Sequence, residues 1–150
     1  MIEKIKKLRA ETGAPLEAIR SAFTQSHGDE GKARKFLTKF AKLTQAKKAS
    51  REARAGLVEA YTHMGKIGVL VEVNCETDFV ARNDAFRTFV HELAMHIAAA
   101  DPNNTSELLA QPFIKDETVT VADRLAELTG KLGEKIVVKR FERYELGQKN

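Results

Sequence analysis

The sequence contains a single cysteine, Cys75, and lacks any long apolar run. One cysteine excludes an intrachain disulfide, which fits a reducing compartment. The longest apolar stretch, around Ile67–Val73, has the length of a strand rather than of a membrane span. The start, MIEKIKKLRA, alternates charged and aliphatic residues and lacks the apolar core of a signal peptide. We therefore expect a cytoplasmic protein with no membrane segment.

Motifs of catalysis and of cofactor binding are also missing. The sequence holds neither a Walker motif nor GxGxxG. His91 and His96 are five residues apart, which turns them to different faces of a helix and argues against a shared zinc ion. Cys75 lies beside Glu76 and Asp78, whose charges disfavour a thiolate. We expect no enzyme activity, no cofactor and no metal, and a structural role for Cys75.

The composition is that of a globular protein, and its charge is divided unevenly. The 150 residues are 43% hydrophobic and 31% charged, enough for a real core without disulfides. Residues 1–55 carry 14 Lys and Arg against 6 Asp and Glu, whereas residues 56–150 carry 11 against 15. Two parts with different tasks are indicated. The basic first part would suit nucleic acid or an acidic protein face.

The first part has the pattern of three short helices. Apolar residues recur at helical spacing in three groups: Ile2, Ile5 and Leu8; Leu16, Ile19, Ala22 and Phe23; Ala33, Phe36, Leu37 and Phe40. Gly13 and Pro15 separate the first two groups, and Asp29 is suited to cap the third helix. We predict a three-helix module over residues 1–41. Residues 42–55 have no apolar face and are predicted to be a basic linker, helical in part.

The second part begins with strands. GLVEAYTH and KIGVLVEVN flank Met64 and Gly65 and predict a β-hairpin, with the apolar residues of Ile67–Val73 alternating onto one face. A helix follows from about residue 84, capped by Asn83 or Asp84, then a loop-like stretch over 105–117 with at most one helical turn. Another helix ends near Gly130, and KIVVKRFERYE is predicted to be the last strand. Residues 56–150 thus form the core domain of an α+β fold, a three-stranded antiparallel sheet with helices packed on it.

Phe79 is an aromatic residue in a mostly polar segment. It belongs to NCETDFVARND, residues 74–84, between the second strand and the long helix. From the pattern alone, burial in the core is the favoured interpretation, because large apolar side chains usually lie inside. The alternative is that the ring is offered to a partner.

Three stretches together indicate a family. NCETDFVARND, preceded by KIGVLVEV, resembles the signature of elongation factor Ts, the nucleotide exchange factor of translation. LRAETGAPLEAIRSAF, followed by HGD, resembles the family's N-terminal ubiquitin-associated-like module. LGEKIVVKR resembles its final core strand with the preceding loop. The three stretches run in the family's order over nearly the whole chain.

The resemblance implies a function and a set of site residues. It implies binding to elongation factor Tu, release of GDP and rebinding of GTP. The positions that match the family's Asp-Phe pair are Asp78 and Phe79, and in the family the Phe wedges into the GTPase near its magnesium site. Thr77 and Val80 complete that motif. The resemblance therefore reverses the interpretation of Phe79 and favours a ring offered to the GTPase.

The resemblance also implies a second contact region and an oligomeric state. Arg9 and Leu16 match the module that holds another helix of the GTPase, and Leu132 and Gly133 match the loop before the last strand. Pro15 departs from the family, which usually has Gly there. Because short members with one core module form homodimers, we expect a homodimer in which each pair binds two GTPase molecules.

A second class of function stays open. Residues 1–55 could form a small nucleic-acid-binding adaptor, a helix-turn-helix with a basic arm on phosphates. Against this, Leu16–Ser26 offers only Arg20 and Gln25 for reading bases. The exchange factor requires no direct contact with nucleic acid. Steep salt dependence of binding would indicate phosphate contacts and so separates the two hypotheses.

Overall fold

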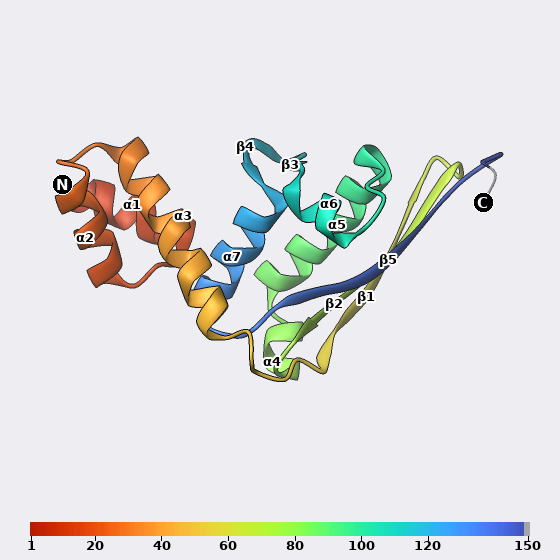
Figure 1. Ribbon diagram of the computed structural model, residues 1–150, viewed down its shortest axis with the longest axis horizontal. Helices are drawn as coiled ribbons and strands as arrows, with labels where there is room; N and C mark the ends of the chain where they lie inside the picture. The colour runs from red at the N-terminus through yellow and green to blue at the C-terminus, as the bar shows by residue number, and fades with distance from the viewer. Residues whose placement is uncertain (149–150) are drawn as a thin grey trace. The chain divides into compact units, whose positions relative to one another are not determined.

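The computed structural model describes residues 1–148 and divides them into two compact units (Figure 1). Unit 1 comprises Met1–Arg51 and Asp123–Lys135, and unit 2 comprises Glu52–Ala122 and the chain from Ile136 onward. The fold is α+β, with N-terminal helices followed by a three-stranded antiparallel sheet with helices, as predicted. Within residues 1–148, no helix is long and apolar enough to cross a membrane.

Unit 1 is built on three N-terminal helices, which confirms the predicted helical pattern. These are α1 (Ile2–Thr12), α2 (Leu16–Gln25) and α3 (Glu30–Lys47). Their apolar stripes meet in one core made of Leu8, Ala18, Ile19, Ala22, Phe23, Ala33 and Leu37. Because α3 continues to Lys47, the first residues of the stretch predicted as a linker are helical. The boundaries of the linker at 42 and 55 stay predictions.

The breaks between these helices follow from local chemistry. Gly13 takes a left-handed conformation at φ 65°, and its N–H donates to the carbonyl of Arg9 at 2.9 Å, which ends α1. Asp29 caps α3, since its carboxylate accepts from the backbone N–H of Lys32 at 2.8 Å. Pro15 precedes the first residue of α2 and cannot continue a helix through its missing N–H.

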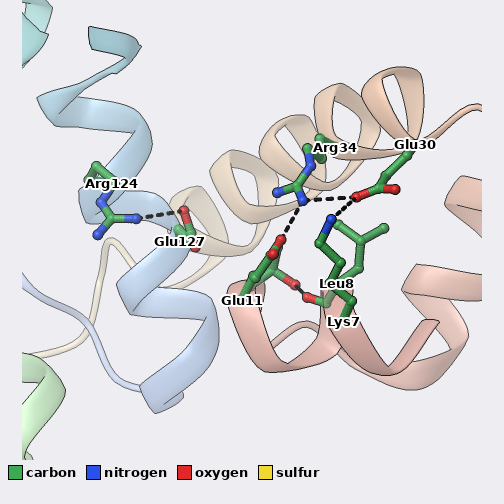
Figure 2. Close-up of polar contacts among 8 residues, drawn as sticks. Lys7, Leu8, Glu11, Glu30, Arg34, Arg124 and Glu127 are labelled. Atoms are coloured by element: carbon green, nitrogen blue, oxygen red, sulfur yellow. Dashed lines mark hydrogen bonds and ion pairs between the residues drawn. The ribbon is translucent and has the colours of Figure 1, made fainter. Parts of the chain in front are cut away.

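A small ionic cluster ties α1 to α3 (Figure 2). Arg34 of α3 pairs with Glu11 of α1 and also with Glu30, at 3.1 Å in the second case. Lys7 of α1 donates to the same Glu30 carboxylate at 3.1 Å. The pKa of Glu30 is lowered, first by the hydrogen bond from Lys7 and then by that from Arg34. Burial lowers the pKa of Arg34, but the hydrogen bonds to Glu11 and Glu30 outweigh it and raise the pKa.

Unit 1 also includes most of a helix from the far end of the sequence. This is α7 (Val121–Leu132), which belongs to unit 1 from Asp123 onward. Lys42 of α3 pairs with Asp123 at 2.8 Å. At the other end of α7, a Cβ atom added to Gly13 would lie only 2.5 Å from Cγ of Lys131. The absence of a side chain at position 13 therefore lets the loop between α1 and α2 approach α7.

Unit 2 is organised around a sheet with strand order β1-β2-β5. The strands are β1 (Ala55–His63), β2 (Ile67–Cys75) and β5 (Val137–Glu145), and both neighbouring pairs are antiparallel. Met64 and Gly65 both have positive φ, and the N–H of Lys66 donates to the carbonyl of His63 at 2.9 Å. This is the geometry of the tight hairpin turn that the sequence predicted.

The two faces of this sheet differ. Two helices, α4 (Asp78–Ala81) and α5 (Asp84–Ala100), pack on the face that buries Val69, Val71 and Val73. The other face, here called the open sheet face, carries Val58, Leu70, Glu72, Arg140 and Tyr144. Exposed fractions of 66% for Val58, 52% for Leu70 and 70% for Tyr144 leave this face with apolar side chains in solvent.

The stretch predicted as a loop over 105–117 contains more structure than expected. It forms α6 (Thr105–Ala110), β3 (Pro112–Phe113) and the start of β4 (Asp116–Thr120), with β3 and β4 paired. Its order comes from a contact that no local pattern reveals. The buried imidazole of His96 in α5 bonds Gln111 Oε1 through Nε2 at 2.9 Å, accepts from the N–H of Ile114 at Nδ1, and stacks on Phe113.

We expect this histidine to make stability depend on pH. Burial lowers the pKa of His96 and the hydrogen bond to Gln111 opposes the shift only in part. At His96 the unfolded chain therefore binds a proton more readily than the folded chain does. As a result, the free energy of unfolding falls as pH drops below about 6.5. The slope from His96 is at most about 1.4 kcal/mol per pH unit. Urea unfolding of wild type and His96→Gln between pH 7.5 and 5 measures it.

His96→Gln should be less stable than the wild type at pH 7.5 but should lose less stability on acidification, because it lacks the buried imidazole. Equal pH slopes in the wild type and His96→Gln would show that the buried imidazole does not couple folding to protons.

A second prediction concerns the approach of Gly13 to α7. Gly13 and Gly28 both have positive φ, at 65° and 82°, so alanine costs about 1–2 kcal/mol at either position. Only at Gly13 would the new methyl group meet another residue, whereas nothing lies within 4 Å at Gly28. We expect Gly13→Ala to lower the free energy of unfolding by about 1–3 kcal/mol more than Gly28→Ala. Identical losses in urea titrations would show that position 13 does not contact α7.

Candidate partner-binding site

The residues of the TDFV motif form a short, capped turn between β2 and α5. β2 ends at Cys75, whose buried thiol donates to the carbonyl of Thr77 at 3.2 Å. The Thr77 hydroxyl then accepts from the N–H of Val80 at 3.4 Å and caps α4. At the far end, the Asn83 side chain accepts from the N–H groups of Ala85 at 2.8 Å and Phe86 at 3.4 Å and so begins α5. Caps at both ends fix the backbone of the turn.

Inside this turn, two side chains point inward and two outward. Val80 is 9% exposed and Ala81 is 5% exposed, and α4 packs on β1, β2 and α5. Successive residues of a helix are turned by about 100°, so a single turn that buries two neighbours directs the preceding two away from the core. Asp78 is exposed, and Phe79 is 86% exposed.

The core placement that the pattern alone favoured for Phe79 is therefore wrong. Val80, the next residue, occupies the inward position of the turn. Full burial of a phenylalanine stabilises a fold by about 1.5–3 kcal/mol, and the exposed Phe79 does not contribute this stabilisation. An aromatic ring held in solvent by a rigid, doubly capped turn has the properties of an anchor for a partner.

The remaining predicted site residues lie in unit 1. Arg9 is exposed near the end of α1, and Leu16 is half-buried as the first residue of α2. Leu132 is the half-buried last residue of α7, and Gly133 follows it with φ 74° and its N–H on the carbonyl of Thr129 at 2.9 Å.

The close approach of Gly13 to Lys131 brings two of the predicted motifs together. The loop before Leu16 and the end of α7 before Leu132 are neighbours in unit 1, although more than one hundred positions separate them in the sequence. The TDFV turn, by contrast, belongs to unit 2. The predicted residues thus form two groups, one in each unit.

The histidines, the cysteine and the carboxylates are the candidates for metal binding or catalysis in the sequence. In the part of the chain that the structure describes, no group of three or more His, Cys, Asp and Glu residues could hold a metal ion. His91 and His96 have different partners, since His91 contacts Glu59 at 3.3 Å while His96 bonds Gln111. Cys75 is fully buried, which fits the structural role expected for it.

Sequence reasoning missed two features near these groups. It assigned α7 to the core domain, and only the missing side chain of Gly13 hints at the approach of Lys131. It also overlooked the open sheet face. The alternation of Leu70 with Val69 and Val71 would have pointed to it, because a buried face on one side leaves Leu70 on the other.

The chain is similar in sequence to members of a known protein family. A family model described as "Elongation factor TS" matches residues 76–150, which include the TDFV turn and the last strand. Elongation factor Ts of Moorella thermoacetica is 40% identical, with 96% of this chain and 94% of the relative covered. The protein of the same name from Rubrobacter xylanophilus is 38% identical, with 97% and 98% covered. That of Koribacter versatilis is 37% identical, with 96% and 87% covered. With matches of this identity over nearly its whole length, the chain belongs to the elongation factor Ts family.

Proposed function

We propose that this chain is the nucleotide exchange factor of elongation factor Tu and works in translation elongation, in the cytoplasm. The observation that carries the proposal is the ring of Phe79, 86% exposed on a turn fixed at both ends. Family membership indicates elongation factor Tu as the partner, and the exposed ring of Phe79 is the group that contacts it in this proposal. Phe79 inserts near the magnesium site of the GTPase and loosens its hold on the metal and the phosphates of GDP.

Exchange by this route needs binding energy and no covalent chemistry. A factor that binds the nucleotide-free GTPase more tightly than the GDP-bound form lowers the affinity for GDP by the same factor, because the two bindings are linked. Incoming nucleotide expels the factor for the same reason. A phenylalanine suits the task, since its side chain has few rotamers to lose on insertion.

The other site residues have distinct tasks in this proposal. Asp78 is exposed beside the ring and contacts the GTPase, while Thr77 and Val80 hold the turn, one as its cap and the other as its buried anchor. In unit 1, Arg9 and Leu16, together with Leu132 and Gly133, hold a second part of the GTPase. Residues 1–41 act as the ubiquitin-associated-like module, 42–55 as the basic linker, and 56–150 as the exchange and dimerisation domain.

We further propose that two copies pair through the open sheet face. Leu70 and Tyr144 lie on that face with exposed fractions of 52% and 70%, and Val58 adds a third apolar side chain. A second copy would present the same side chains and remove them from water, as a two-fold interface requires. The pair would then bind two GTPase molecules.

One observation favours a second candidate function, binding of nucleic acid by unit 1. Lys32, Lys35 and Lys39 are exposed on α3 at spacings of three and four residues, which places them along one side of the helix. Exchange needs no nucleic acid, so the two functions are separable. Binding through these lysines would weaken steeply and log-linearly with salt.

The proposed exchange function predicts a large effect of removing the ring. Phe79→Ala should lose most of the acceleration of GDP release from elongation factor Tu, because truncation of a central anchor typically costs 2 kcal/mol or more, a factor of about 30. Release of a fluorescent GDP analogue, followed by stopped flow, measures it. Since the ring is in solvent, the variant should unfold at the same urea concentration as the wild type.

Phe40→Ala is the matched control, since Phe40 is a partly exposed phenylalanine of α3 outside the predicted site. It should leave GDP release unchanged. If wild type and Phe79→Ala accelerate release equally, the ring is not the exchange element. If the wild type has no effect on release, the proposed function itself is wrong.

The proposed pairing predicts the mass in solution. At micromolar concentration, sedimentation should give twice 16.7 kDa for the wild type and 16.7 kDa for Leu70→Lys. Lysine is chosen because Glu142 lies directly opposite Leu70 on β5 and accommodates the charge within one chain. Leu43→Lys, at a 58% exposed position of α3, should remain a dimer. A wild type that sediments only at 16.7 kDa contradicts the pairing.

A further inference from the structure

A single lysine holds the segment that follows α3. The ammonium of Lys135 donates to the backbone carbonyls of Ala49 at 2.6 Å and of Arg51 at 2.9 Å. These partners lie 86 and 84 positions earlier in the sequence. An ammonium group has three donors in total, so two of them serve this one stretch of backbone.

The stretch that Lys135 holds has no buried side chain to anchor it. After α3 ends, short-range backbone hydrogen bonds run from the N–H of Ala49 to the carbonyl of Ala46 and from the N–H of Arg51 to the carbonyl of Lys48. Residues 48–51, here called the elbow, have no buried side chain. Composition predicted a linker here, partly helical or flexible. The two hydrogen bonds from Lys135 therefore tie the elbow to a part of unit 1 that is distant in the sequence.

The contact of Lys135 lies where two segments of unit 1 end. Arg51 and Lys135 are the residues at which the chain leaves unit 1 and continues into unit 2. The third connection runs inside α7, which is one continuous helix from Val121 to Leu132. Lys135 thus ties together the two connections that no helix stiffens.

We propose that Lys135 is a positioning residue for exchange, which keeps the elbow ordered so that the contact residues of unit 1 and Phe79 of unit 2 engage one GTPase molecule together. This inference rests on the proposed function. When two binding elements are joined, the second binds at an effective concentration set by the connection, and an ordered connection loses less entropy on binding than a loose one. Loss of the contact should therefore weaken binding and leave the rate at saturation unchanged.

Trypsin tests the contact itself, because Lys47, Lys48, Arg51 and Arg54 all offer cleavage sites in or beside the elbow. Limited digestion of the full chain, read by mass spectrometry at these four sites, should be several-fold faster in Lys135→Met than in the wild type. Lys115→Met removes an exposed lysine of the turn between β3 and β4 and should leave these four rates unchanged. Equal elbow cleavage in wild type and Lys135→Met overturns the role of Lys135 in ordering the elbow.

Exchange kinetics test the consequence. Lys135→Met should raise the concentration of factor needed for half-maximal GDP release from elongation factor Tu by about 3- to 10-fold, with the saturating rate within about twofold of the wild type. Lys135→Arg keeps the charge and the donors and should recover part of the loss. A lower saturating rate with an unchanged half-maximal concentration overturns the positioning role, and so does no change in either.

The two experiments separate this inference from the proposed function. A wild type that does not accelerate GDP release overturns the proposed function, and the role of Lys135 in exchange falls with it. The trypsin digestion still decides whether Lys135 orders the elbow. Acceleration by the wild type with unaltered kinetics in Lys135→Met retains the proposed function and rejects the inference.

Discussion

The exchange function proposed for this protein depends on the burial of Val80 and Ala81 in the turn between β2 and α5. These two residues hold the single helical turn of α4 against the sheet, Thr77 caps the start of α4, and Asn83 caps the start of α5 directly after it. Because α4 is a single turn, the inward positions of Val80 and Ala81 fix the direction of the Phe79 side chain, which points away from the core. Its exposure follows from ordinary packing and capping, with no strained residue within α4, as none of Asp78–Ala81 has a positive φ.

The same principle of fixing by neighbours operates in unit 1. Three helices supply a small core, the ion pair of Lys42 with Asp123 links α3 to α7, and Gly13 leaves room for Lys131. Arg34 joins α1 to α3 from the solvent side. Each of these contacts joins segments that are distant in the sequence.

Local patterns predicted most of the fold because most of its elements carry their own signals. Alternation in β2, turn residues at Met64 and Gly65 and the cap at Asp29 act over a few positions. The patterns failed where long-range contacts decide. The hairpin of β3 and β4 depends on His96, and the exposure of Phe79 depends on which neighbour takes the inward position. The family resemblance, rather than the pattern, pointed the ring outward.

The central claim is that the ring of Phe79 enters the GTPase beside its magnesium site, and site-specific photo-crosslinking tests this most directly. A photoreactive phenylalanine analogue at position 79 would be irradiated with nucleotide-free elongation factor Tu, and the crosslinked peptides would be identified by mass spectrometry. The account predicts crosslinks to the segments that bind magnesium and phosphate, and their loss when GDP and magnesium are added in excess. Crosslinks confined to other surfaces, or crosslinks insensitive to GDP, would contradict it.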